Sequence, residues 1–147
     1  MNERDSFVAS FRELQPKFSR MYVQMLDRVD LTLPQYTLLY QLMSLGSVSM
    51  TVVSDRLEIT KPAVTNLVDR LEEKKCLKRV PNHKDRRVIQ LEILPKGQKI
   101  ITEIQAKSLG LLLKAYDQFS GKEHQVISRF YASVSKVADD FLARSRK

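Results

Sequence analysis

The repeat of apolar residues changes in the middle of the chain, and this change limits the possible folds more than any other feature. The stretches 50–57 and 61–74 both follow a helical repeat, and the short gap between them leaves room only for a tight turn. The next apolar stretches, 76–80 and 88–94, follow the repeat of a strand, with the turn-forming sequence PNHKDRR between them. Two short helices with a tight link, followed by a hairpin, predict a winged helix-turn-helix.

Polar residues predict where the two short helices begin. Ser49 and Thr60 are suitable N-caps, because their side-chain oxygens can accept unpaired amides of the first turn. Pro62 lies in the first turn of the second helix, where a missing amide hydrogen costs nothing. The side chains expected to face inward are Val52, Val53 and Leu57 in the first helix, and Val64, Leu67, Val68 and Leu71 in the second.

Longer helical stretches flank this central part. Residues 3–29 carry apolar side chains at alternating steps of four and three, which places them along one side of a helix. Pro16 interrupts this pattern and predicts either a kink or a division into two helices. Further helices are expected from Leu33 to before Gly46, from Pro95 to about Gln118, and after Gly121, with Ser47 and Val48 as a short connector.

The expected fold is therefore mainly α with a small β-hairpin. A winged helix-turn-helix domain over 32–95 is flanked by a helical dimerisation region made of 1–31 and 96–147. The terminal stretches have more apolar surface than a small central domain needs. They either pack within one chain or interlock in a dimer, and a repeat close to 3.5 residues favours the dimer.

The positive charge is concentrated in two parts of the chain. The 147 residues include 25 Lys and Arg against 17 Asp and Glu, a formal net charge of +8. Residues 54–87 hold ten basic and six acidic side chains, a net +4 over the helix pair and hairpin. Residues 95–147 hold ten and five, a net +5 for which the sequence offers no specific role. This balance indicates a polyanionic partner.

Composition excludes several other classes of protein. One cysteine cannot form a disulfide framework, and with two histidines it forms no catalytic triad or metal cluster of recognisable spacing. We therefore expect no enzyme, no metal and no cofactor. No apolar run reaches the length of a membrane span, and the charged start of the chain lacks the apolar core of a signal peptide. A cytoplasmic protein with no membrane partner is the expectation.

The outer side of the helix at 61–74 carries groups suited to DNA bases. Its first half offers Lys61, Thr65 and Asn66. In the major groove Asn suits adenine and Lys suits guanine. The acidic residues gather toward the other end of the helix, away from the expected DNA. An ordinary solvated helix surface is the alternative interpretation.

The hairpin tip is strongly basic. Lys84, Arg86 and Arg87 crowd one short loop, where like charges repel each other unless an anion neutralises them. A narrow minor groove attracts inserted Arg side chains in this way. We expect Asp85 to accept hydrogen bonds that hold one of these arginines in place. A solvated turn is again the alternative.

From Leu33 to Gly97 the sequence resembles the MarR family of winged-helix transcription regulators. The resemblance rests on the stretches LTLPQYTLLYQL, ITKPAVTNLVDRLEEKKCLKR and DRRVIQLEILPKG. It implies an obligate homodimer built from the terminal helices, with each recognition helix in the major groove of a pseudo-palindromic, double-stranded DNA operator. The implied function is sequence-specific regulation of transcription, with repression as the expected direction.

The resemblance also implies roles for particular residues. Arg87 matches the wing arginine of the minor groove, and Arg86 is an extra basic residue beside it. The full set of expected DNA-binding residues is Ser49, Ser54, Arg56, Lys61, Pro62, Thr65, Asn66, Arg70, Lys84, Asp85, Arg86 and Arg87. Two positions depart from the family pattern: Lys75 stands where a glycine usually ends the recognition helix, and Pro95 replaces a capping Thr. A Lys that keeps the left-handed turn costs about 1 kcal/mol.

An effector site and a redox site are the remaining hypotheses. Many relatives are released from DNA by small aromatic or anionic molecules, and the residues that could line such a pocket here are Lys17, Arg20, Tyr22, Tyr36 and Tyr40. The same residues could equally serve packing and surface roles. We expect Cys76 to be a buried structural residue, although neighbouring lysines would favour its thiolate if it were exposed.

Two alternative functions follow from the same sequence. A winged helix can serve as a protein-interaction module without sequence-specific DNA binding, which predicts no effect of charge reversal in the hairpin. A redox-sensing regulator acting through Cys76 is the other alternative.

Overall fold

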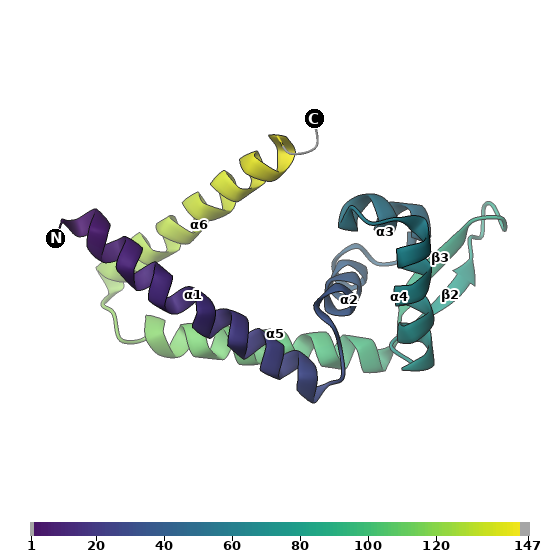
Figure 1. Cartoon of the computed structure of the whole chain (residues 1–147), viewed down its shortest axis with the longest axis horizontal. Helices are drawn as coiled ribbons and strands as arrows, with labels where there is room; N and C mark the ends of the chain where they lie inside the picture. Colours follow the sequence, from purple (N-terminus) through teal and green to yellow (C-terminus); the bar gives the residue numbers. More distant parts are fainter. Residues whose placement is uncertain (1, 145–147) are drawn as a thin grey trace. The chain divides into compact units, whose positions relative to one another are not determined.

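The computed structural model describes residues 2–144, and these form six helices and three strands (Figure 1). The elements are α1 (Glu3–Arg28), α2 (Leu33–Leu45), β1 (Val48–Ser49), α3 (Met50–Leu57), α4 (Lys61–Glu73), β2 (Leu77–Pro81), β3 (Ile89–Ile93), α5 (Pro95–Tyr116) and α6 (Gly121–Arg144). The expected mainly helical fold with a small sheet is confirmed. The chain falls into two compact units, one up to Ala106 and one from Lys107 onward, and each is described by itself.

The division of the chain into a winged helix-turn-helix domain, residues 32–95, and a dimerisation region, residues 1–31 and 96–147, stays a prediction. Its outermost residues, Met1 and residues 145–147, lie outside the described part of the chain. Two of these residues, Arg146 and Lys147, contribute to the net +5 of the C-terminal stretch.

Side-chain caps start the helices where the sequence indicated. Ser49 Oγ accepts the amide of Val52 at 3.2 Å and begins α3. Thr60 Oγ1 accepts the amide of Ala63 at 3.3 Å and begins α4. These bonds satisfy amides that have no partner within the helix, which is why short polar residues are favoured there. Both predicted helix starts are confirmed.

The sheet has β3 at its centre, with β1 and β2 antiparallel on either side. In the β2–β3 hairpin, Leu77 pairs with Ile93 and Pro81 with Ile89. Strand β1 occupies the segment that the sequence indicated as a connector, and it pairs Val48 with Leu91. A strand of two residues has no measurable repeat, so the apolar pattern could not reveal it.

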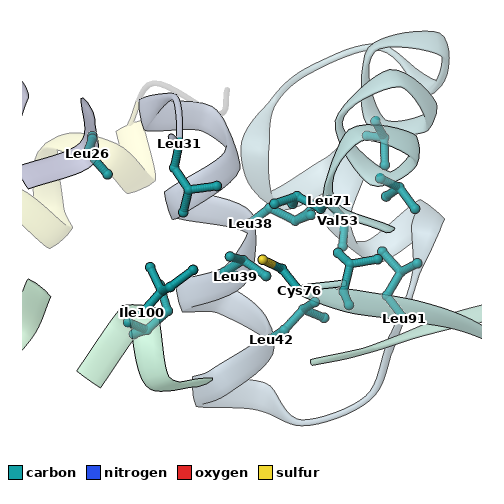
Figure 2. Close-up of a cluster of buried hydrophobic side chains, with 14 of the residues drawn as sticks. Leu26, Leu31, Leu38, Leu39, Leu42, Val53, Leu71, Cys76, Leu91 and Ile100 are labelled. Atoms are coloured by element: carbon teal, nitrogen blue, oxygen red, sulfur yellow. The ribbon is translucent and has the colours of Figure 1, made fainter. Parts of the chain in front are cut away.

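The core of the first unit lies around the leucines of α2. Leu38, Leu39 and Leu42 are fully or almost fully buried. Figure 2 shows them beside Cys76, with Leu71 of α4 and Leu91 of β3 in the same cluster. Ile100, Ile101 and Ile104 extend this core along the first turns of α5. Burial of one such side chain contributes about 1.5–3 kcal/mol, so the helix pair, the sheet and the start of α5 are held together as one body.

The predicted division of the first helix at Pro16 was wrong, because Pro16 lies inside an uninterrupted α1, whereas the alternative, a kink at Pro16, stays a prediction. Both Pro16 and Arg12 are exposed, so water can reach the Arg12 carbonyl that loses its helical partner. Val52 is exposed rather than inward-facing, whereas Val53 is buried and Leu57 half-buried. Val53 and Leu57 lie one turn apart on the packed side of α3, and Val52 is about 100° away from that side.

Helix α4 ends in a left-handed turn. Lys75 has a φ of 58°, a conformation that glycine adopts most readily. The Cys76 amide donates to the Leu71 carbonyl at 2.9 Å and closes this helix end. The turn is therefore retained in spite of the lysine side chain.

The second unit consists of the C-terminal part of α5 and the whole of α6. The Tyr116 and His124 rings stack with their centroids 3.9 Å apart, and His124 Nε2 lies 2.9 Å from the Tyr116 carbonyl oxygen. No residue of α6 is buried. Among the described residues, no helix is both long and apolar enough to span a membrane.

Gly97 provides a test of how closely α5 approaches the sheet. A Cβ at this position would lie 2.3 Å from the Cys76 carbonyl oxygen, far inside van der Waals contact. We predict that Gly97→Ala lowers the free energy of unfolding by about 1–3 kcal/mol, measured by urea denaturation. Gly110→Ala, in the same helix, is the control. A Cβ there meets nothing within 4 Å, so we expect this substitution to raise stability by about 0.4–1 kcal/mol. Equal effects of the two substitutions would contradict the close approach.

Candidate nucleic-acid interface

The link between α3 and α4 is held by bonds within the turn. The Ser54 hydroxyl donates to the Ile59 carbonyl at 2.7 Å, and the Ile59 amide donates to the Ser54 carbonyl at 3.2 Å. Glu58, between them, takes the left-handed conformation with a φ of 53°. Ser54 and the capping Ser49 therefore have structural roles in this turn, whereas Arg56 is exposed. Among Ser49, Ser54 and Arg56, three of the residues expected to bind DNA, Arg56 is the exposed one.

The exposed side of α4 carries the groups that the sequence indicated. Val64, Val68 and Leu71 are buried, which leaves Lys61, Pro62, Thr65, Asn66 and Arg70 exposed. Leu67, also expected to be buried, is half-buried. The first turn of α4 contains no acidic residue. Its unpaired amides and the positive end of the helix dipole therefore act together with the Lys61 ammonium on any nearby anion.

Hydrogen bonds within α4 determine what two of these side chains can offer. The Thr65 hydroxyl donates to the Lys61 carbonyl at 3.1 Å, so the threonine presents its oxygen lone pairs and its methyl group. Arg70 Nε donates to Asn66 Oδ1 at 3.0 Å, so the Asn66 NH₂ group is the part of that amide still able to donate. The sequence had placed Arg70 on this surface without indicating that it orients Asn66.

Arg79 of β2 fastens the C-terminal half of α4 to the sheet. Its Nη2 lies 2.6 Å from Asp69 Oδ1, its Nη1 donates to Glu72 Oε2, and its amide donates to Glu72 Oε1 at 3.0 Å. Burial alone would lower the pKa of Arg79, but the hydrogen bonds to Asp69 and Glu72 outweigh it and raise the pKa. Arg79 of the sheet therefore neutralises two carboxylates near the C-terminal end of α4. Sequence reasoning missed this contact because its partners lie seven and ten residues away across a turn.

The wing loop is shaped by two short acceptors. Asn82 Oδ1 accepts the amides of Lys84 at 2.7 Å and of Asp85 at 3.2 Å. Asp85 accepts three bonds from Arg87: from the amide at 3.0 Å, from Nε at 3.1 Å and from Nη2 at 3.2 Å. The expectation that Asp85 holds an arginine is confirmed. Sequence reasoning missed Asn82, although an Asn at the start of a turn is a known signal for such bonds.

Arg87 remains accessible in spite of this pairing. Its side chain is 91% exposed, and Arg86 and Lys84 are exposed as well. The Arg87 guanidinium bond, followed by the Arg87 amide bond, holds the pKa of Asp85 below its usual value, so this carboxylate stays ionised at neutral pH. Figure 1 shows the β2–β3 hairpin on one side of α4. The fork of Arg87 is thus presented in a defined orientation on the same unit as α4.

The expected effector residues separate into two groups. The centroids of the Tyr36 and Tyr40 rings lie 6.2 Å apart, with the ring planes tilted by 33°. Burial, followed by the proximity of Tyr22 and Tyr40, raises the pKa of Tyr36. The basic pair lies on α1: Lys17 binds Glu13 at 2.6 Å, and Arg20 lines a shallow groove together with Gln15, Pro16, Ser19 and Val23. Tyr36 thus lies close to Tyr22 and Tyr40, whereas the residues that line the groove beside Arg20 all belong to α1.

Cys76 is buried, with 1% of its surface exposed, which confirms its structural interpretation. Burial raises the pKa of its thiol, and this outweighs the lowering effect of Lys96 and Lys74. The reactive thiolate is therefore disfavoured. Among the described residues, no cluster of side chains could hold a metal ion.

The tight helix pair, the three-stranded sheet and the basic hairpin define a winged helix-turn-helix protein. The model of the MarR family matches residues 29–88. The HTH-type transcriptional repressor MdtR of Bacillus subtilis is 27% identical over 91% of this chain and 84% of its own length. A MarR family protein from Bacillus stearothermophilus has a similar structure, with a TM-score of 0.78 and 25% identity over 95% of this chain and 99% of the other. The part of this chain that holds the helix pair and the hairpin is therefore similar to the MarR family of transcription regulators.

One further structural likeness concerns a nucleic-acid complex. The S. aureus MepR–DNA complex matches with a TM-score of 0.72 and 22% identity, over 89% of this chain and 96% of MepR. At that identity the likeness shows a shared fold.

The contact of Arg79 with α4 can be tested directly. We predict that Arg79→Met lowers the free energy of unfolding by about 1–3 kcal/mol, because it removes two charge-assisted hydrogen bonds made by a side chain that is only 26% exposed. Lys78→Met is the matched control. Lys78 pairs with Glu92 at 3.2 Å where both side chains are about half exposed, and such pairs contribute at most about 1 kcal/mol. Thermal unfolding of both variants measures the two effects. A loss of stability in Lys78→Met as large as that in Arg79→Met would contradict the role given to Arg79.

Proposed function

We propose that this chain is a homodimeric, sequence-specific DNA-binding repressor in which α4 enters the major groove and Arg87 the minor groove. One observation carries the proposal. The exposed first half of α4 and the oriented guanidinium of Arg87 belong to the same compact unit and are joined through the buried core. A rigid unit with both features is what contact with two adjacent grooves requires.

The side chains on α4 support base recognition in the major groove. This groove admits an α-helix and exposes a distinct set of donors and acceptors for each base pair. Lys61 and the NH₂ group of Asn66 offer donors, whereas Thr65 offers an acceptor and a methyl group. Because Arg70 already occupies one side of Asn66 Oδ1, the donor of the Asn66 amide is the group most available to a base acceptor.

Exposed apolar side chains support the homodimer. On α1 these include Phe11, Leu14 and Val23, and on α6 Val126, Val134, Val137 and Leu142, each at least 48% exposed. A helix of 24 residues with no buried side chain needs a partner for its apolar side. A second copy supplies that partner and makes the DNA-binding surface two-fold, which predicts half-sites about 34–36 Å apart. MepR and MdtR, one solved with DNA and the other described as a repressor, support the same function.

The tyrosine group of α1 and α2 is the most plausible place for an effector. Tyr22 and Tyr36 pack against the core, and the exposed ring of Tyr40 lies beside Tyr36. A small aromatic molecule that stacks on these rings would act on the junction of both helices. Release of the DNA by such a molecule is part of the proposal.

Substitution of Arg87 tests the assignment of the wing. An operator is first obtained by selection from random duplexes and then titrated by fluorescence anisotropy at several salt concentrations. We predict that Arg87→Ala weakens binding about tenfold or more on most sequences and reduces the salt slope by about one for each protomer. Arg4→Ala, which removes the same charge from the first turn of α1, is the control. Equal affinity of the wild type and Arg87→Ala would refute the wing assignment.

Substitution of Asn66 tests base recognition. Asn66→Ala is expected to lose about 1–3 kcal/mol of discrimination at one base-pair position in each half-site, with little change in the salt slope. Arg70→Ala should relax the preference at the same position by a smaller amount, because it frees the Asn66 amide to rotate. Competition among operators mutated one base pair at a time measures both effects. A uniform loss over all positions would show that Asn66 reads no base.

A further inference from the structure

The C-terminal end of α4 is joined to two other elements by the side chains of Asp30, Lys74 and Lys96. Lys74 is the C-cap of α4, and its ammonium donates to the Asp30 carbonyl and contacts Asp30 Oδ2 at 2.9 Å. Lys96 Nζ, in the first turn of α5, donates to the Lys74 carbonyl at 2.9 Å. Asp30 lies between α1 and α2. These three residues, called the Lys74 group below, therefore connect the end of α1, the end of α4 and the beginning of α5.

The chemistry of the Lys74 group favours a fixed geometry. A cation at a helix C-terminus is stabilised by the unpaired carbonyls and by the negative end of the helix dipole. The Lys74 side chain is only 28% exposed, so its position is more restricted than that of a surface lysine. Asp30 has a φ of 53°, which directs its carbonyl and its carboxylate toward the same ammonium.

The backbone beside the Lys74 group is tightly packed. The Leu94 amide donates to the Cys76 carbonyl at 2.9 Å, and Gly97 leaves no room for a Cβ against that carbonyl. The beginning of α5 thus lies directly against the chain that leaves α4.

We infer that Lys74 is a positioning residue that sets the orientation of the recognition helix relative to α1 and α5. The inference rests on the proposed DNA-binding function and deepens it. Helix α4 has 13 residues, and Lys74 lies at the end opposite Lys61 and Thr65. At about 1.5 Å per residue, a tilt of about 5° about the Lys74 group moves the DNA-contacting end by roughly 1.5–2 Å. A displacement of that size exceeds what a preorganised binding surface tolerates.

The test compares two substitutions in the Lys74 group with a neighbouring control. Lys74→Gln removes the ammonium. Asp30→Asn removes the carboxylate charge but keeps a residue that tolerates the left-handed conformation, and the Asp30 carboxylate is exposed, so this variant is expected to fold normally. Lys75→Asn, one residue further on, removes the same charge as Lys74→Gln at a position where Asn also tolerates the turn. Each protein is titrated with the selected operator over a range of salt concentrations.

The inference predicts that Lys74→Gln weakens operator binding roughly 2- to 30-fold and leaves the salt slope unchanged. Asp30→Asn should weaken binding less, since the bond from Lys74 to the Asp30 carbonyl remains. The double variant with both Asp30→Asn and Lys74→Gln should bind the operator no more weakly than Lys74→Gln alone. Three results would overturn the inference: a loss of affinity in Lys74→Gln equal to that in Lys75→Asn, additive losses in the double variant, or a salt slope reduced by about one in Lys74→Gln. A reduced salt slope would mean that Lys74 contacts a phosphate.

Amide hydrogen exchange of the DNA-free protein provides a second measurement that does not depend on the proposed function. Lys74→Gln should accelerate exchange both at Cys76, after α4, and at Leu31, after Asp30, whereas Lys75→Asn should affect only the first. Unchanged exchange at Leu31 would contradict the connection between the two elements. If the wild type bound DNA without dependence on salt or sequence, the proposed function would fail, and the exchange data would still decide whether the Lys74 group joins α1 to α4.

Discussion

The burial of one side of α4 is the interaction on which the proposed function depends. Val64, Val68 and Leu71 pack into the core around the leucines of α2. That packing leaves the opposite side of α4 exposed and fixes which residues can reach DNA. The same core holds β3 and the first turns of α5, so the recognition helix, the wing and the start of α5 share one rigid support.

The two ends of α4 differ in their charges. Arg79 forms ion pairs with Asp69 and Glu72 near the C-terminal end of α4, whereas the first turn of α4 carries Lys61 and no acidic residue. In the wing, Asp85 neutralises part of Arg87 but also orients its guanidinium. Of the basic residues in 54–87, Lys61 and Arg70 are exposed on α4, and Lys84, Arg86 and Arg87 are exposed at the hairpin tip.

Much of the fold could be predicted from sequence because it is encoded locally. Ser49 and Thr60 mark helix starts through their own side-chain oxygens, and the apolar repeat of α4 identifies its buried side. The position of Asp85 within the wing likewise predicted its bond to an arginine. These features depend on residues within four positions of each other, so a single sequence contains all the information they need.

Contacts between distant residues could not be predicted in the same way. The bonds of Arg79 to α4, of Lys74 to Asp30 and of Lys96 to Lys74 join residues that come together only after the core has formed. The two residues of β1 have no repeat, and the tolerance of Pro16 depends on the exposure of α1 to water. The bond of Arg70 to Asn66 was locally accessible, since the two are one helical turn apart, but the pattern does not distinguish it from an unpaired surface arginine.

Chemical footprinting of the protein on its selected operator tests the central claim most directly. If α4 lies in the major groove and the wing in the minor groove, purine N7 positions should be protected in two regions about 10–10.5 base pairs apart, or a multiple of that spacing, with minor-groove protection beside each region. Protection of the DNA backbone alone, without major-groove protection at a repeated spacing, would contradict the account.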